Sequence, residues 1–245
     1  MLKRLFTSAL FAGLCAGALA ALLQLTFVVP LILLGELYET GTLVHYGKAG
    51  SIESSLDAGQ IVPPESVDTS DQPAVGHAGQ SQRDLTRSIR TFAMFLVSYT
   101  GFALVLVTAF ALAERAGQKI TARNGALWGL CGFIVFQLAP AFGLPPELPG
   151  AQAAALELRQ IWWAGCVLAT ATGLALLAFG RGPVLLASGA IVIALPHLLG
   201  APTAAFAGVA PPELAAHFAT RVLGACAICW VLLGSVGGAF WSRSA

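Results

Sequence analysis

The sequence predicts an all-α protein, a polytopic bundle of transmembrane helices with six spans, although five are also compatible with it. Hydrophobic residues make up 57% of the 245 residues and charged residues only 10%, whereas a soluble domain carries about 25% charged residues. Six stretches of 21 to 31 residues contain no Asp, Glu, Lys or Arg, and about 20 apolar residues are enough to cross a bilayer. These observations exclude a soluble globular enzyme and a disordered chain. The net charge of +1 gives no basic surface for nucleic acid.

The charge-free stretches place the spans, which form a single integral membrane domain over residues 1–245. We predict spans near 6–29, 91–113, 124–142, 160–180, 183–200 and 218–240. The first also resembles a cleaved secretory signal, because basic residues precede it and Ala18-Leu19-Ala20 resembles the small-residue pattern of a cleavage site. Its apolar run continues through Leu34, beyond the roughly 7–15 residues of a signal core. We therefore predict an uncleaved span.

The distribution of basic residues predicts that both termini are cytoplasmic. In this orientation the cytoplasmic side holds seven Lys and Arg residues against one acid, Glu114, and the outer side holds six against eleven acids. The basic counts alone differ little, so the prediction rests on the short segments. Residues 35–90 form the one substantial hydrophilic region and are rich in Ser, Gly, Pro and acids. This composition predicts a long extracytoplasmic loop that is largely disordered.

Each span that runs outward carries a proline near its outer end: Pro30, Pro140 and Pro196. The sequence Pro-Pro-Glu-Leu follows two of these spans, at 145–148 and 211–214. The pattern predicts three helical hairpins whose outgoing helices are broken in the outer leaflet, because proline removes a backbone hydrogen bond. Broken helices recur at transporter binding sites, but prolines also kink many membrane helices that bind no ligand.

The strongly polar side chains inside the predicted spans are Gln24, Gln137 and His197, and each lies near one of the three prolines. Polar groups in lipid are costly and usually face a bundle interior or a cavity. We therefore predict that these three side chains share one depth and face a path for a cation. His197 could instead be an interfacial residue bonded to a carbonyl.

Carboxylates follow the outgoing spans, and an imidazole lies in the long loop. The candidate metal ligands outside the spans are Glu36, Glu39, Glu147, Glu213 and His45. Carboxylate plus imidazole is a ligand set for cobalt, nickel or zinc, and an acidic mouth concentrates cations. With Gln24, Gln137 and His197 these residues form the predicted metal-binding set, although each acid could also belong to a solvated loop.

Cysteines and glycines occur inside the predicted spans. Cys226 and Cys229 share a helix face, and we interpret all five cysteines, these two included, as small apolar residues that pack between helices. Pairs of glycines four residues apart occur at 13 and 17, at 125 and 129, and at 234 and 238. Such pairs allow two helices to approach closely.

Several strings resemble one family. They are Leu138–Gly150 (LAPAFGLPPELPG), Arg159–Trp163 (RQIWW), Pro196–Pro202 (PHLLGAP), Pro212–Ala215 (PELA) and the region Pro30–Glu39. In order along nearly the whole chain, they resemble the CbtA family of predicted cobalt transporter subunits. The resemblance implies a bacterial inner-membrane protein of five or six spans, linked to cobalt supply for cobalamin synthesis, with the small single-span CbtB protein as a partner. Family members often carry a histidine-rich first loop, whereas this loop has only His45 and His77.

The sequence thus predicts a component of a divalent cation transporter, with cobalt as the cation. We predict no enzymatic activity, no cofactor besides the transported cation, and contacts with lipid and a CbtB-like subunit. The sequence contains no Gly-x-x-x-x-Gly-Lys-Ser/Thr loop for ATP, so energy would come from a gradient or a partner. One alternative is an accessory or assembly subunit that does not transport. A membrane redox or cofactor-binding protein is the weaker alternative. Haem ligation needs histidines inside spans, and His197 is the only histidine inside a predicted span.

Overall fold

The computed structural model describes residues 2–44, 77–204 and 208–243, and for residues 77–84 it describes the backbone alone. The described chain is helical throughout its regular parts, which confirms the all-α bundle. In the described part of the chain, five helical segments are long and apolar enough to cross a membrane: Leu2–Glu39, Leu85–Arg115, Ala122–Ala141, Leu156–Phe179 and Pro212–Arg243. A sixth apolar helix, α7 (Pro183–Leu199), has 17 residues. Five or six spans were predicted, and the structure agrees.

Two of the outgoing helices are interrupted by one turn of π-helix, and the same spacing precedes the proline in both. In the first, α1 (Leu2–Leu23) leads through η1 (Gln24–Val28) into α2 (Val29–Glu39). In the second, α4 (Ala122–Phe133) leads through η2 (Ile134–Leu138) into α5 (Ala139–Ala141). Each π-segment ends two residues before Pro30 or Pro140, and each contains one of the intramembrane glutamines. Proline and π-turns are known causes of kinks, so these two interruptions confirm the predicted breaks near Pro30 and Pro140. The third helix, α7, contains Pro196 without such a segment.

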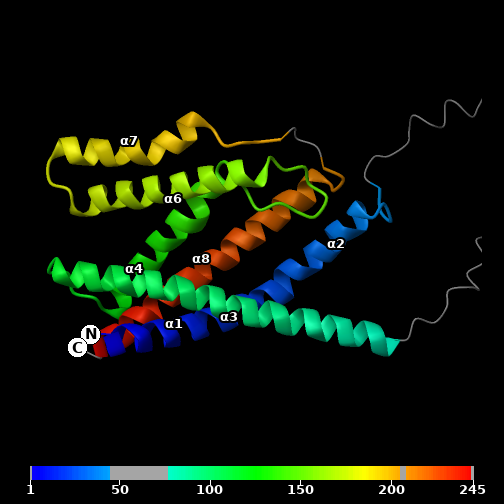
Figure 1. The fold of residues 1–245 in the computed structure, drawn as a ribbon, viewed down its shortest axis with the longest axis horizontal. Helices are drawn as coiled ribbons and strands as arrows, with labels where there is room; N and C mark the ends of the chain where they lie inside the picture. Colours follow the sequence, from blue (N-terminus) through cyan, green and yellow to red (C-terminus); the bar gives the residue numbers. More distant parts are fainter. Residues whose placement is uncertain (1, 45–76, 205–207, 244–245) are drawn as a thin grey trace, which may run out of the picture.

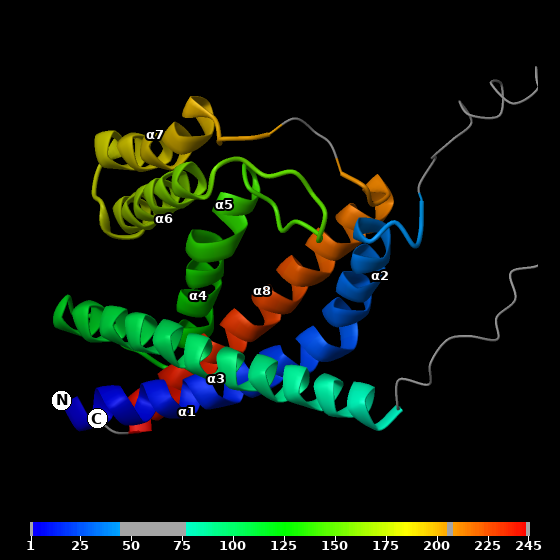
Figure 2. The same ribbon diagram turned by 45° about the vertical axis from the view of Figure 1, so that its right-hand side comes forward.

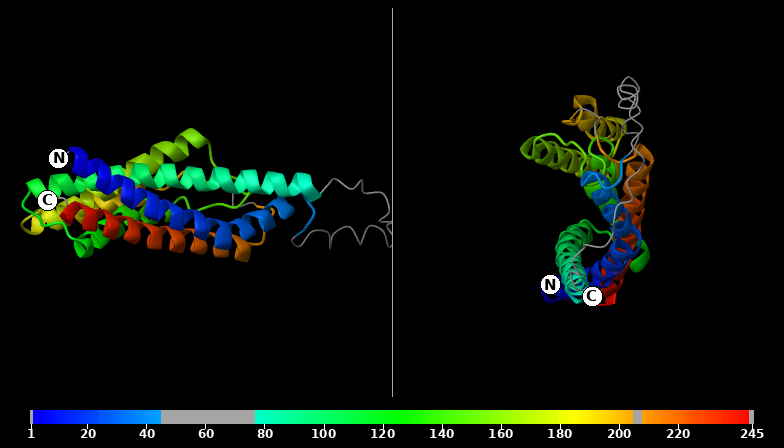
Figure 3. Two further views of the ribbon diagram at one scale, coloured as in Figure 1. Left: turned by 90° about the horizontal axis from the view of Figure 1, so that it is seen from below. Right: turned by 90° about the vertical axis from the view of Figure 1, so that its right-hand side faces the viewer.

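The helices pair differently from three consecutive hairpins. The long helix α3 (His77–Arg115) packs along α1 as predicted, and α1 also packs along α8 (Pro212–Arg243). However, α4 packs along α8, and α6 (Leu156–Phe179) packs along α7. Figure 2 shows α6 and α7 side by side, away from α1, α3 and α8, with α6 next to the segment that runs from α4 to α5. The two termini lie next to each other at one end (Figures 1 and 3).

Glycines determine the α4–α8 pairing. A β-carbon on Gly125 would overlap the Gly234 carbonyl oxygen, and one on Gly129 would overlap the Trp230 carbonyl oxygen. A β-carbon on Gly238 would likewise overlap the Thr121 carbonyl oxygen. Two of the predicted glycine pairs therefore pack against each other, which confirms their role in close helix contact. The surrounding core places Trp230, Trp241 and Phe110 almost fully out of solvent.

The predicted loop 35–90 is helical at both of its described ends. Helix α2 continues to Glu39, and α3 already begins at His77. Residues 45–76, with His45, lie outside the described part of the chain. A small apolar cluster of Val28, Leu31, Leu148 and Phe218 joins the end of the first helix to the segment after α5 and to the start of α8.

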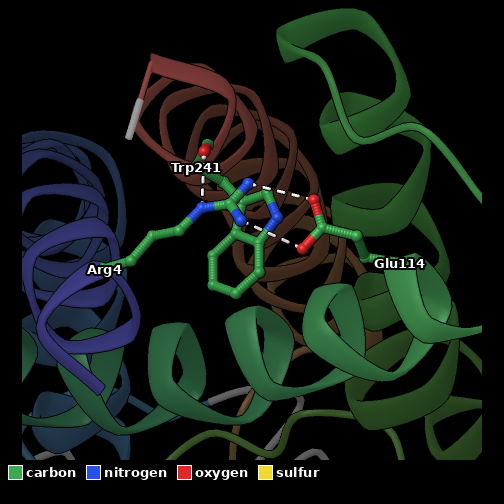
Figure 4. A network of polar contacts seen from close by, with 3 residues as sticks. All are labelled: Arg4, Glu114 and Trp241. Atoms are coloured by element: carbon green, nitrogen blue, oxygen red, sulfur yellow. Dashed lines mark hydrogen bonds and ion pairs between the residues drawn. The ribbon is translucent and has the colours of Figure 1, made fainter. Parts of the chain in front are cut away.

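One charged residue links three helices beside the two termini (Figure 4). The Arg4 guanidinium on α1 donates to both carboxylate oxygens of Glu114 on α3, at 3.0 and 3.1 Å. Its Nε donates to the Trp241 carbonyl on α8 at 2.8 Å, and its Cζ lies 4.0 Å from the centre of the Trp241 ring. Bidentate pairing and stacking on an aromatic ring both suit arginine better than lysine.

We expect Arg4→Ala to lower the free energy of unfolding by about 1–2 kcal/mol, because it removes charged hydrogen bonds and a cation–π contact from a partly exposed site. Arg4→Lys keeps the charge but loses the fork, so it should restore less than half of the loss. Denaturant titration of the purified protein in detergent measures both variants. Equal stability of Arg4→Lys and the unchanged chain would show that charge alone acts here.

Candidate cation site

A cavity of about 1380 Å³ lies between the end of the second outgoing helix, the α6–α7 pair and the start of α8. Most of its wall is apolar, and its polar or titratable lining includes Glu147, Trp162, Thr170 and His197. An apolar cavity with a few convergent polar groups is the usual form of a small-ligand site. Two predicted ligands, Glu147 and His197, thus line the same cavity.

His197 lies in the last turn of α7. The preceding residue, Pro196, accepts a hydrogen bond on its carbonyl from the Trp162 indole N–H at 3.3 Å, and Gly200 ends the helix with a φ of 82°. The His197 ring meets the Trp162 ring nearly edge-on, with centroids 6.0 Å apart. Its Nε2 lies 4.0 Å from the Cys166 Sγ on α6. The imidazole is therefore held against α6 by Trp162 and Cys166.

Gln137 lies in η2, whose residues Ile134 and Leu138 line the larger cavity while Gln137 does not. It lines a second cavity of about 350 Å³ together with Pro140, Glu147, Arg159 and other residues. Glu147 lines both cavities, and its carboxylate pairs with the Arg159 guanidinium at 3.1 Å. Gln137 and His197 therefore do not face one common space, and Glu147 is the predicted ligand that the two spaces share.

Two guanidinium groups lie against the segment that carries Gln24 and Glu36. Gln24 lies half-buried in η1 and lines neither of these two cavities. In the same π-segment the Phe27 carbonyl accepts a hydrogen bond from the Arg221 guanidinium at 3.1 Å. Glu36 pairs with Arg87 at 2.9 Å. Guanidinium groups at these places oppose the approach of a divalent cation.

Two further predicted ligands, Glu39 and Glu213, are exposed. Glu39 lies at the end of α2, beside Gly150, and Glu213 lies in the first turn of α8, where His217 follows one turn later. Within the described ranges, no three side chains of His, Cys, Asp or Glu come together as a metal centre. The described residues therefore offer pairs of donors rather than a complete coordination sphere.

The comparison with known families settles the relationship of this chain. A family model described as probable cobalt transporter subunit (CbtA) matches residues 2–242. The chain belongs to the CbtA family. No curated protein and no solved structure matches it. The family consists of cobalt transporter subunits, so the substrate of the transporter is a metal ion. Together with the several apolar helices, this makes the chain a multi-pass membrane protein.

Sequence reasoning missed one polar neighbour of His197 in this CbtA chain. Cys166 is fully buried and was interpreted as a packing residue together with the other cysteines. Its proximity to His197 results from the pairing of α6 with α7. The spacing of residues 166 and 197 in the sequence does not predict this contact. Cys226 and Cys229 do lie in the main apolar cluster, near Tyr99, as packing residues would.

Proposed function

We propose that this CbtA protein carries cobalt(II) across the bacterial inner membrane, through the larger cavity and past His197. The observation that supports this route is that a carboxylate, Glu147, and an imidazole, His197, line the same cavity. Glu147 attracts the hydrated cation at the mouth, and His197 offers a nitrogen donor that suits cobalt better than magnesium or calcium. The acids Glu39 and Glu213 and the loop residue His45 add to the negative or coordinating character of the outer side.

The rest of the proposal follows from the sequence. Both termini face the cytoplasm, the imported cobalt serves cobalamin synthesis, and a small single-span CbtB-like subunit associates with the bundle. Because the chain lacks an ATP-binding phosphate loop, an ion gradient or a partner supplies the energy. Gln24 and Gln137 contribute less in this proposal, since neither lines the larger cavity.

The ion pair between Glu147 and Arg159 provides a test, because replacing its two members should change the affinity for cobalt in opposite directions. Glu147→Gln removes the negative charge from the mouth, so we expect the cobalt concentration for half-maximal uptake to rise about threefold to tenfold. Arg159→Gln frees the same carboxylate from its partner, so that concentration should fall. Uptake of radiolabelled cobalt into liposomes that contain the purified full-length chain measures both effects.

Glu157→Gln is the matched control, because Glu157 lies in the first turn of the same helix as Arg159 and lines neither cavity. Its uptake should equal that of the unchanged chain. Changes of the same sign in Glu147→Gln and Arg159→Gln would contradict the electrostatic role of the mouth. If the chain alone takes up no cobalt under any imposed gradient, the accessory-subunit alternative holds instead.

A further inference from the structure

A thiol and an imidazole face each other between α6 and α7. Cys166 Sγ and His197 Nε2 are 4.0 Å apart, and the cysteine is completely shielded from solvent. His197 lines the larger cavity, and Cys166 is packed behind it, on the side of α6. The pair is thus within reach of the cavity through the imidazole.

The pair joins the middle of α6 to the last turn of α7. Cys166 is ten residues from the start of α6 and thirteen from its end at Phe179, which at 1.5 Å per residue places it about 15 Å and about 20 Å from the two ends. His197 is fourteen residues from the start of α7 at Pro183 and two from its end at Leu199. The thiol is therefore central in its helix, and the imidazole reaches it from the end of the antiparallel partner.

The separation of the two atoms suits a bridging metal ion. With metal–sulfur and metal–nitrogen bonds of about 2.3 and about 2.05 Å, tetrahedral coordination places the sulfur and the nitrogen about 3.6 Å apart. The observed 4.0 Å therefore requires only a small side-chain movement. On binding, the metal–sulfur bond replaces the sulfur–hydrogen bond, and the thiol proton passes to water in the cavity.

A third polar group lies beside this pair. Thr170 follows Cys166 by one turn of α6, is 1% exposed, and lines the larger cavity. Its hydroxyl has no partner at hydrogen-bond distance within the described chain, and the Cys166 thiol is near enough to interact with it. A buried hydroxyl without a partner costs about 1–3 kcal/mol. A ligand in the cavity, or its bound water, would satisfy it.

We propose that Cys166 and His197 form an intramembrane site for a borderline divalent cation, with Thr170 binding a water of its coordination shell. The site rests on the proposed function, because its ligand is the cation that crosses the membrane. Sulfur and nitrogen donors select cobalt, nickel or zinc over magnesium and calcium. With two protein donors the cation is held weakly enough to leave again, as conduction requires.

The test is the absorption spectrum of the full-length protein in lipid nanodiscs during titration with cobalt(II) chloride under reducing conditions. A cobalt–thiolate bond produces a charge-transfer band in the near ultraviolet. We expect the unchanged chain to show this band and Cys166→Ser to lose it. His197→Gln should weaken cobalt binding at least tenfold. Cys15→Ser is the matched control, because Cys15 is an exposed cysteine on another helix, and it should keep the band.

His197→Cys guards against a variant that simply fails to fold. It places a second thiol opposite Cys166, so the charge-transfer band should become stronger, whereas structural damage could only weaken it. The proposal is overturned if Cys166→Ser keeps the band, or if Cys15→Ser loses it. Cobalt uptake by the unchanged chain without a Cys166-dependent band also overturns this site, while the proposed transport stands. A Cys166-dependent band without uptake supports the site and contradicts the proposed transport.

Discussion

Replacing Gly129 or Gly234 by alanine is expected to separate α4 from α8 and to destabilise the protein by about 3 kcal/mol. A β-carbon at Gly129 overlaps the Trp230 carbonyl oxygen, and one at Gly234 overlaps the Gly125 carbonyl oxygen. Both obstacles are backbone atoms, which cannot turn aside as a flexible side chain does. Because α8 also packs along α1, a displaced α8 disturbs the main apolar core as well. Denaturant titration in detergent, followed by circular dichroism, measures the loss.

Gly165→Ala and Gly224→Ala are the matched controls. Both glycines lie inside long helices, and a β-carbon there would have no atom within 4 Å. Alanine is the better helix former by roughly 0.5–1 kcal/mol, so these variants should be as stable as the unchanged chain or slightly more stable. If all four variants lose the same stability, the close approach of α4 and α8 does not explain the destabilisation by alanine at Gly129 and Gly234.

His197→Ala should reduce cobalt accumulation to the background level in cells that lack other cobalt importers. His197 is the imidazole in the wall of the larger cavity, and among the described residues no cluster of three ligands replaces it. The side chain makes ring contacts with Trp162 and Phe142, so a fluorescence-detected size-exclusion profile should accompany the uptake measurement.

His217→Ala is the matched control for this loss. His217 is an exposed histidine in α8 and lines neither cavity. Its variant should accumulate cobalt normally. Normal accumulation by His197→Ala would remove this residue from the transport path, and equal losses in both variants would show that histidine content as such matters.

The class of fold and its breaks could be predicted because each depends on local sequence. Absence of charge over a membrane thickness identifies the spans, and Pro30 and Pro140 mark helix breaks wherever the neighbouring helices lie. The glycine pairs on α4 and α8 announced surfaces for close packing. The sequence did not show that these two glycine pairs would pack against each other, because helix association inside a membrane depends on matching surface shapes. Consecutive hairpins were therefore expected where α4 in fact packs with α8.

The candidate site was predictable only in part, and for the same reason. His197 and Glu147 were identified as rare polar groups near helix breaks, and they share a cavity. Gln24 and Gln137 were predicted to share the depth of His197, but a position along a helix does not determine the face of the bundle, and neither glutamine lines this cavity. Arg87 and Arg159 neutralise Glu36 and Glu147 through contacts between segments. Charge counts along a loop do not reveal such pairs.

The 17 residues of α7 extend over only about 26 Å, whereas the lipid tails need about 30 Å. The bilayer beside α7 is therefore expected to thin locally by a few ångströms, which lowers the lipid headgroups towards the helix ends. Such a dimple brings water and phosphate closer to His197 than they stand elsewhere around the bundle. Bilayer thickness thus becomes a variable of this protein, and cobalt uptake should be slower in vesicles made of longer-chain lipids.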